Sequence, residues 1–493
     1  GAKIHWLDDR LPRLEKVYEQ NESFDLILLS AVWMHVQPDE RDLAMQRLRG
    51  LLAPGGKIVI STRSVQFSGN RTMYAVDPER LRRRAEDHEL AVDLEKTSED
   101  MLGREEVSWS TLVLRRPDEG LSALPTLRNI IVNDNKSSTY KLALLRTLAR
   151  IAAASPGLVV RRDDGYCDVP LGLVALYWLK SYWELVTDGI PQQAHGGQTS
   201  KFRSELLEAD EKISNYDLRI GNQFSGRTAQ LLHAALRVVR DTVRDGPAKY
   251  TTHVGSDDPI FKYDGRGFGA SGVSSSVSAL ELRPEYLESY GALRVPTSIY
   301  EALERHWVWI EPTVLNEWVS LMRRYESTDD RSYEAYRDAL LWRDVDERET
   351  REVAEIVDGF LQTGNPAAVG IWTGRSLTES TPIEIDHCIP YSLWYNNSLW
   401  NLFPSTSTAN QSKRDRVPAQ ELLDASKARI HHWWGEAFLD SERTRRFAME
   451  ADAALPGTDL DPDQPDLDDI FEALMWQVDR MRRDQQVDTW SGP

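Results

Sequence analysis

The chain has 493 residues, with 41% hydrophobic and 28% charged residues, a formal net charge of -19 and two cysteines. Length and composition predict a soluble globular protein of about three domains, and the scarcity of cysteine excludes a disulfide framework and a zinc ribbon. The acidic balance excludes a protein that coats nucleic acid over its whole surface, because phosphate binding needs clustered Lys and Arg.

The first 117 residues predict part of a doubly wound sheet. The apolar run FDLILLSAVWMH at 24–35 is typical of a parallel strand that is buried on both faces. A helix follows from 38, with acids in its first turn and a Pro-Gly-Gly stop ending at 56. Further strands are predicted at 57–63 and 104–116, and the second of these alternates like a late antiparallel strand.

The segments FDLILLSAVWMH and LLAPGGKIVIS resemble the fourth strand, and the turn into the fifth strand, of class I S-adenosylmethionine-dependent methyltransferases. The resemblance covers residues 1–117 and implies that IHWLDDRLP is the third strand, with Asp8 contacting the adenine end of the cofactor. The family binds the rest of the cofactor on a glycine-rich loop and a second-strand acid. Both would precede Gly1, so we expect S-adenosylmethionine to need a missing segment or a separate chain, or this part to be a structural remnant.

Residues 118–326 are predicted to be mainly helical. In KSSTYKLALLRTLARIAAA, an apolar stripe leaves Lys141 and Arg146 on the surface, as a solvated basic face or a phosphate-contacting one. The apolar run PLGLVALYWL is too short for a membrane span and predicts a buried helix. With no signal-peptide pattern at the first residues, we expect a cytoplasmic location.

Residues 327–455 contain the side chains whose chemistry suits catalysis. AAVGIWTGRSL and PIEIDHCIP are predicted as two strands, followed by an extended piece SLWNLFP and a helix with ANQSKRD. Phosphodiester hydrolysis needs a base for water and neutralisation of phosphoryl charge. His387 suits the first task, while Asp386 and Asn410 are hard oxygen ligands. Neighbours on a strand face opposite sides, so Asp386 and His387 can serve one phosphate only where the strand bends or ends.

The motifs DHCIP, NNSLWNL and NQSK resemble the ββα-metal motif of HNH endonucleases over residues 366–425. The resemblance implies that His387 is the general base and that Asn401 fixes the loop that aims it. Asp386 and Asn410 would bind a divalent metal, Mg²⁺ or Mn²⁺. The predicted contacts to the nucleic-acid backbone are Lys413, Arg414 and Arg416.

Two features around this motif allow more than one interpretation. Four tryptophans, Trp394, Trp400, Trp433 and Trp434, could stack on bases, but they more often fill a small core. Residues 456–493 are predicted as an acidic linker and an amphipathic helix that docks on this chain or on a partner. One hypothesis is that the acidic run screens the cleft, so that deleting 457–493 raises cleavage.

The predicted fold class is multidomain α/β plus α, with a partial Rossmann-like methyltransferase sheet, a mostly helical middle and a ββα-metal motif. The predicted function is hydrolysis of DNA phosphodiester bonds by a metal-dependent HNH endonuclease in prokaryotic defence or restriction. A homodimer would supply the two sites that two strand breaks need. One alternative is a methyltransferase completed in trans by a further chain, with the HNH part binding nucleic acid. Another is a non-catalytic assembly subunit.

Overall fold

The chain folds into two compact units, residues 1–122 and 123–493, which together make a mixed α/β protein with a sheet near the N-terminus and many helices. In the part of the chain that the structure describes, no helix is long and apolar enough to cross a bilayer. This computed structural model describes residues 4–20, 22–63, 72–88, 90–99, 107–116, 123–162, 164–193, 202–210, 212–253, 256–270, 272–326, 331–341, 348–394, 396–439 and 441–493.

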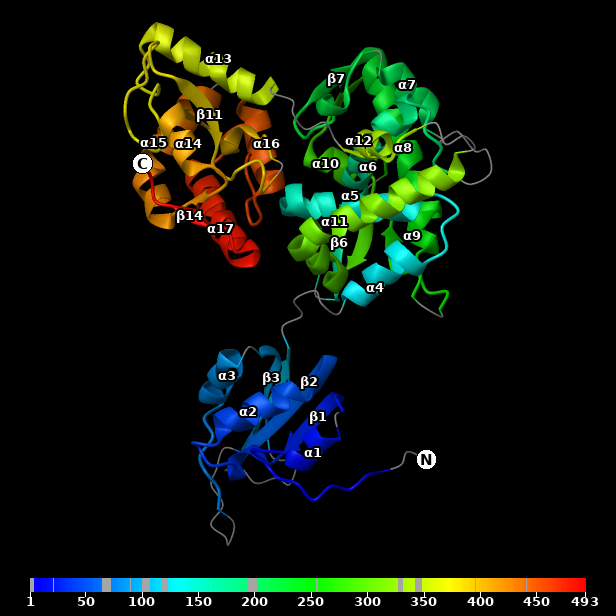
Figure 1. Ribbon diagram of the computed structural model, residues 1–493, viewed down its shortest axis with the longest axis vertical. Helices are drawn as coiled ribbons and strands as arrows, with labels where there is room; N and C mark the ends of the chain where they lie inside the picture. Colours follow the sequence, from blue (N-terminus) through cyan, green and yellow to red (C-terminus); the bar gives the residue numbers. More distant parts are fainter. Residues whose placement is uncertain are drawn as a thin grey trace. The chain divides into compact units, whose positions relative to one another are not determined.

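The N-terminal unit is a four-stranded sheet in the order β1-β2-β4-β3 (Figure 1). The pair β1–β2 is parallel and the other two pairs are antiparallel. Helices α2 and α3 contribute to the core that covers one face of this sheet. The elements are α1 (Glu15–Glu19), β1 (Phe24–Ser30), η1 (Trp33–His35), α2 (Arg41–Gly50), β2 (Leu52–Arg63), α3 (Pro78–Asp87), β3 (Ala91–Glu99) and β4 (Ser108–Arg115).

Strand β1 corrects the prediction of a strand buried on both faces. Leu29 is buried, whereas Leu26 and Leu28 on the opposite face are 60% and 64% exposed. The strand ends at Ser30, because Ala31 takes a left-handed conformation with φ 56° and a 3-10 turn follows. The alternation therefore describes a half-covered strand at the edge of its sheet.

The predicted third strand at 4–12 does not form. An extended segment becomes a strand only when it has a ladder partner, and residues 4–10 pair with no strand among those described. Ile4 and Trp6 are accordingly 74% and 89% exposed.

The helical region follows, and α5, α6 and α11 supply much of its core (Figure 1). Every residue of α5 from 142 to 153 is buried. The helices and 3-10 or π turns are α4 (Leu124–Arg128), η3 (Asn129–Asn133), α5 (Tyr140–Ala154), η4 (Pro156–Leu158), α6 (Leu171–Thr187), α7 (Arg203–Asp210), η5 (Asn215–Asp217), α8 (Gly226–Asp245), α9 (Pro247–Tyr250), η6 (Gly267–Gly269), α10 (Pro284–Glu288), α11 (Thr297–Tyr325) and α12 (Tyr333–Leu340). The strands are β5 (Val160–Arg161), β6 (Tyr166–Pro170), β7 (Gln223–Ser225), β8 (Lys262–Asp264), β9 (Ala279–Glu281) and β10 (Ala292–Pro296).

Two predictions for this region need correction. Arg146 is fully buried rather than on a basic face, because Glu311 on α11 accepts its Nε–H at 3.0 Å. The region also extends past the predicted end at 326, since Tyr336 and Leu340 of α12 lie in its core. The prediction of a buried helix around PLGLVALYWL is confirmed by α6.

Residues 348–493 contain the motif for which a nuclease was predicted, and we call them the nuclease region after that prediction. They have their own aromatic-rich core. Its strands β11 and β12 are antiparallel, with Ile383 opposite Thr406 and His387 opposite Leu402. Its elements are α13 (Arg348–Thr363), β11 (Ile383–His387), η7 (Leu399–Asn401), β12 (Leu402–Thr406), α14 (Ser407–Lys413), β13 (Val417–Pro418), α15 (Gln420–Phe438), α16 (Thr444–Ala454), α17 (Leu467–Gln485) and β14 (Thr489–Trp490).

The segment 367–377, predicted as the first strand of the motif, is a turn. Gly374 has a φ of 65° and donates its N–H to the carbonyl of Gly370 at 2.8 Å, which folds the chain back on itself. Only an isolated bridge between Val369 and Ser376 remains of the expected strand. The two strands of the ββα arrangement are therefore β11 and the short extended piece that became β12.

Residues 456–493 belong to the nuclease region rather than forming a separate linker and helix. Helix α17 packs on α15, and Trp490 of β14 is 2% exposed. The apolar residues that α17 buries in this core are Ile470, Phe471, Leu474, Val478 and Met481. The four tryptophans of the motif are also at most 2% exposed, so they fill the core rather than stack on bases.

Candidate active site

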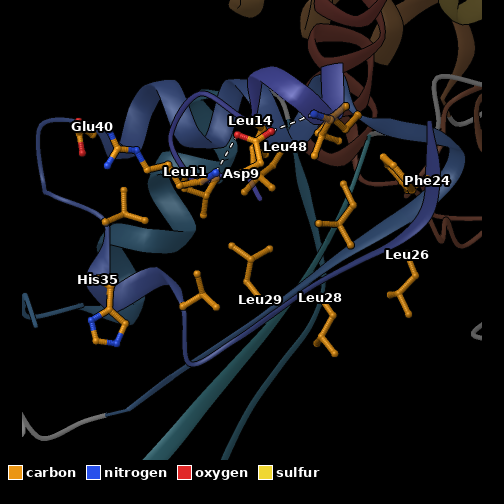
Figure 2. Close-up of a pocket in the computed structure, with 16 residues that line it drawn as sticks. Asp9, Leu11, Leu14, Phe24, Leu26, Leu28, Leu29, His35, Glu40 and Leu48 are labelled. Atoms are coloured by element: carbon orange, nitrogen blue, oxygen red, sulfur yellow. Dashed lines mark hydrogen bonds between the residues drawn. The ribbon is translucent and has the colours of Figure 1, made fainter. Parts of the chain in front are cut away.

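The N-terminal unit contains a cavity of about 680 Å³ beside β1 (Figure 2). Apolar side chains such as Leu11, Leu28 and Leu29 make up most of its wall. Asp9 also lines it, with its carboxylate accepting the backbone N–H groups of Arg10 and Val17 at 2.8 and 3.0 Å. Asp8, the residue predicted to contact a cofactor, is exposed and does not line this cavity.

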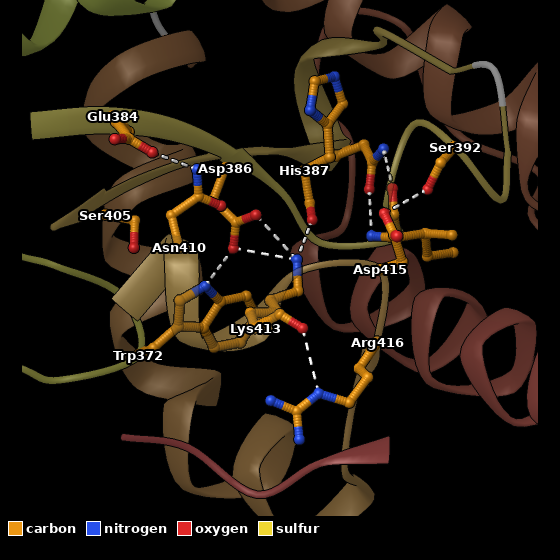
Figure 3. Close-up of polar contacts among 12 residues, drawn as sticks. Trp372, Glu384, Asp386, His387, Ser392, Ser405, Asn410, Lys413, Asp415 and Arg416 are labelled. Carbon is orange, nitrogen blue, oxygen red and sulfur yellow. Dashed lines mark hydrogen bonds and ion pairs between the residues drawn. The ribbon is translucent and has the colours of Figure 1, made fainter. Parts of the chain in front are cut away.

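In the nuclease region, β11 ends at His387, which meets the condition that the strand stop at the Asp-His pair. Alternation along the strand places Glu384 and Asp386 toward α14 and turns the His387 ring the other way (Figure 3). Asp386 and His387 therefore present their side chains to two sides of the same strand end.

Asp386 is held in one orientation by three hydrogen bonds and is 5% exposed. Its Oδ2 accepts the indole N–H of Trp372 at 2.6 Å. The ammonium of Lys413 donates to Oδ1 at 2.8 Å and to Oδ2 at 3.0 Å (Figure 3). The charge of a buried carboxylate is thus matched by a buried cation, which avoids the large cost of an unpaired charge.

Lys413 is fully buried, and its ammonium also donates to the backbone carbonyl of His387. A side chain without solvent exposure is not offered to a DNA phosphate, which corrects the predicted role of this lysine. It lies here because Asn410 and Lys413 share a helix face, and that face packs on β11 rather than facing solvent.

The two predicted arginines remain at the surface beyond the end of α14. Arg414 is exposed, with φ 53°, and Arg416 is partly exposed and donates to the carbonyls of Lys413, at 3.2 Å, and Ser412. Both line a polar cavity of about 690 Å³, which also has Asp415 and Asp488 in its wall. The cavity therefore carries charges of both signs.

Asn410 on α14 donates its amide N–H to Glu384 at 2.5 Å, which leaves the amide oxygen for another partner. That oxygen and the Asp386 carboxylate are the donors that a hard divalent cation prefers. A carboxylate has about four acceptor positions, and three hydrogen bonds to Asp386 leave one of them at Oδ1. One position at Oδ1 of Asp386 and the amide oxygen of Asn410 are therefore the oxygen donors that these two residues offer. In the described part of the chain no three His, Cys, Asp or Glu side chains gather as a ready metal cluster.

His387 is partly buried, and its Nε2 lies 2.7 Å from the amide oxygen of Asn397. Because this oxygen can only accept, Nε2 carries the proton and Nδ1 keeps its lone pair. Burial lowers the pKa of His387 below its usual 6.5, against the opposing effects of Asn397 and Asp386. The imidazole is therefore neutral near pH 7, with one nitrogen able to accept a proton.

Asn401, predicted to fix the loop after β11, is fully buried. Its amide oxygen accepts the N–H of Ile389 at 2.9 Å, and its amide nitrogen donates to the carbonyls of Ile389 and Asn396 at 3.2 and 3.0 Å. Asn401 thus closes the loop on itself without touching the imidazole.

Sequence reasoning missed three residues that contact the predicted site. Asn397 contacts His387, Trp372 contacts Asp386, and Glu384 contacts Asn410. Asn397 lies within the NNSLWNL motif, where three asparagines were available. Period-two alternation from Asp386 could have identified Glu384, but nothing in the sequence pairs Trp372 with Asp386.

Comparisons with protein families match three segments of the chain. Residues 10–60 match a methyltransferase domain, residues 120–340 a domain of unknown function (DUF8808), and residues 372–419 an HNH endonuclease. No curated protein matches the chain. The chain therefore combines a segment similar to methyltransferase domains with a segment similar to HNH endonucleases, as the sequence motifs predicted.

Proposed function

We propose that the nuclease region is a metal-dependent HNH endonuclease that hydrolyses DNA phosphodiester bonds. The observation that carries this proposal is the placement of His387, which ends β11 with its Nε2 2.7 Å from the amide oxygen of Asn397, while burial lowers the pKa of the imidazole. A general base must have a free lone pair at working pH and a fixed orientation. The match to HNH endonucleases supports the same role.

In this proposal His387 takes the proton of the attacking water at Nδ1. Asn397 keeps the proton on Nε2, and Asn401 holds the loop that carries Asn397. Arg414 and Arg416, exposed and partly exposed beyond α14, contact the DNA backbone. Local contacts of this kind suit a chain whose overall charge of -19 opposes broad DNA binding.

Asp386 and Asn410 would hold a divalent ion, Mg²⁺ or Mn²⁺, through a carboxylate oxygen and an amide oxygen. The ion, when bound, supplies neutralisation of phosphoryl charge and support for the departing 3′ oxygen. Glu384 orients Asn410, and Trp372 with Lys413 orients Asp386. Outer contacts of this kind fix the geometry of metal ligands.

A role in prokaryotic defence or restriction follows by analogy, since a nuclease joined to a methyltransferase-like segment suits the destruction of foreign DNA. Cutting both strands needs two such sites, so we propose a homodimer for double-strand cleavage. One site alone would nick.

The test is incubation of supercoiled plasmid with the protein and Mg²⁺ or Mn²⁺, comparing the native chain with His387→Ala. We expect the native chain to nick or linearise the plasmid and the variant to lose about 100- to 10,000-fold in rate. His432→Ala removes an exposed histidine of α15 and serves as the matched control. Equal cleavage by His387→Ala and the native chain would contradict the proposal.

The second candidate function is methyl transfer by a fold completed in trans. The cavity beside β1 and the match at 10–60 favour it. Calorimetric titration of the chain with S-adenosylmethionine separates the two, because binding with no plasmid cleavage supports this candidate.

A further inference from the structure

We infer that the helical region is part of the nuclease: the end of α5, together with the shared helix α16, holds the loop that positions His387, by contacts to Trp394 and from Glu450. This inference rests on the proposed function and deepens it, because it gives a role to residues 123–340. The loop in question leaves β11 directly after His387 and carries Asn397, and the structure describes it over residues 388–394 and 396–401.

Trp394 ties this loop to the end of α5. Its ring is 2% exposed, and its indole N–H donates to the carbonyl of Ala153 at 2.5 Å. Ala153 lies in the last turn of α5, where helix carbonyls have no partner inside the helix and bear partial negative charge. An indole N–H, which can only donate, therefore satisfies a carbonyl that would otherwise be buried without a partner.

Glu450 on α16 makes the second tie and is 7% exposed. One carboxylate oxygen accepts the backbone N–H of Leu399 at 2.8 Å, and Leu399 is the first residue of the turn η7 that ends at Asn401. The other accepts Nε of Arg446 at 2.8 Å, and Arg446 also pairs with Glu352 of α13 at 2.9 Å. The loop is thus gripped at both Trp394 and Leu399.

Helix α16 itself is shared between the two regions. Phe447 and Ala451 belong to the core of the nuclease region, while Met449 and Ala453 belong to the core of the helical region. At η4 the approach is so close that a Cβ on Gly157 would lie 2.0 Å from the carbonyl oxygen of Asp452. A glycine is required there by the contact between the two backbones.

Hydrogen bonds within the described part of the loop add to these ties. Asn401 bonds to Ile389 and Asn396, and the side-chain oxygen of Asn396 accepts the N–H of Ser398 at 2.8 Å. Asn397 sits between these anchors, three residues from Trp394. A shift of the loop therefore moves the Asn397 oxygen away from Nε2. The proton of the neutral His387 ring is then no longer confined to Nε2. Trp394 and Glu450 are positioning residues, acting through Asn397.

The test compares Trp394→Phe with Trp318→Phe. Each variant keeps a buried ring and loses one buried indole hydrogen bond, which for Trp318 goes to Gln192 at 3.0 Å inside the helical region. Histidine-labelled protein reports the imidazole tautomer of His387 by NMR, assigned with His387→Gln. We expect Trp394→Phe to give mixed tautomers and to lower kcat about 10- to 100-fold with KM nearly unchanged. Trp318→Phe should change neither.

A second variant covers the case in which Trp394→Phe fails to fold. Gly157→Ala forces η4 and α16 apart far from the imidazole, with Gly435→Ala as the control at a glycine with open space around it. The same loss of the single tautomer is expected for Gly157→Ala alone. A single Nε2–H tautomer in both Trp394→Phe and Gly157→Ala would overturn the inference. The NMR result stands without cleavage, so an inactive native chain rejects the proposed function alone.

Discussion

An aspartate–lysine pair in the nuclease region and one in the N-terminal unit differ in burial, and only the first, the sealed pair, is almost wholly buried. Asp386 and Lys413 are 5% and 0% exposed, whereas Asp93 and Lys57 lie on a sheet face with side chains 32% and 50% exposed. The sealed pair is further oriented by Trp372, which Trp490 contacts edge-on at 6.1 Å. The buried ion pair holds the Asp386 side chain in one orientation, because losing either partner would leave an unpaired buried charge. The exposed pair constrains its side chains little, because water can replace either partner.

Deleting residues 457–493 removes α17 and β14, and with them Trp490, which contacts Trp372 beside the sealed pair. This deletion takes away five large apolar side chains of α17, each worth about 1.5–3 kcal/mol of burial, and so about 10 kcal/mol in all. That sum matches the whole stability of a typical domain, so we expect the nuclease region to unfold. Calorimetry and plasmid cleavage on the truncated chain measure this. Faster cleavage by a folded truncated chain would instead support screening by the acidic run.

The sealed pair is broken by Lys413→Met, which leaves the Asp386 carboxylate buried without its cation. We expect the unfolding free energy to fall by about 3–5 kcal/mol, measured by urea denaturation. Adding Asp386→Asn in the same chain should restore much of the loss, because no buried charge remains. Lys427→Met is the matched control, since its pair with Asp468 is exposed and should matter little. An equal loss of unfolding free energy in the two lysine variants would contradict the claim that burial makes the Asp386–Lys413 pair the more important one.

Removing the lysine of the exposed pair should lower the unfolding free energy only slightly, and mainly at pH values where Asp93 is ionised. The hydrogen bond from Lys57 is the main cause that holds the pKa of Asp93 below 3.8, with burial opposing it. A depressed carboxylate pKa stabilises the fold above pH 3.8 and ceases to do so as pH falls through the folded pKa. Lys57→Met should therefore cost less than about 1 kcal/mol at pH 7, and a smaller amount at pH 2, where Asp93 is more protonated. Urea denaturation of both proteins at the two pH values checks this. A cost that persists undiminished at pH 2 would mean that packing of the lysine stem, not the ion pair, is responsible.

Local patterns were enough to predict the elements that depend on residues close in sequence. The apolar run before Ser30, the Pro-Gly-Gly stop after α2 and the run inside α6 all led to elements that the structure contains. The DHCIP and NQSK motifs likewise led to β11 and α14. In each case the signal and its cause lie within a few turns of chain.

Partners that are distant in sequence could not be predicted. Arg146 and Lys413 look like surface cations, yet Glu311 and Asp386 meet them in the core from 165 and 27 residues away. The motif resemblance assigned Asn401 to the loop, but only the fold shows that Asn397, rather than Asn401 or Asn396, contacts His387. The strand predicted at 367–377 was wrong for a similar reason. Gly374 takes a positive φ, which turns the chain back toward Gly370 although the sequence pattern resembles a strand.

The pairing of β14 with β13 has a consequence for synthesis on the ribosome. Val417 and Pro418 find their strand partners at Thr489 and Trp490, which emerge about seventy residues later. Until then Trp372 lacks the ring that contacts it edge-on, and the Asp386 carboxylate depends on Lys413 and an unbraced indole. The order of translation thus delays the completion of the Asp386 site until residues 489 and 490 have been made.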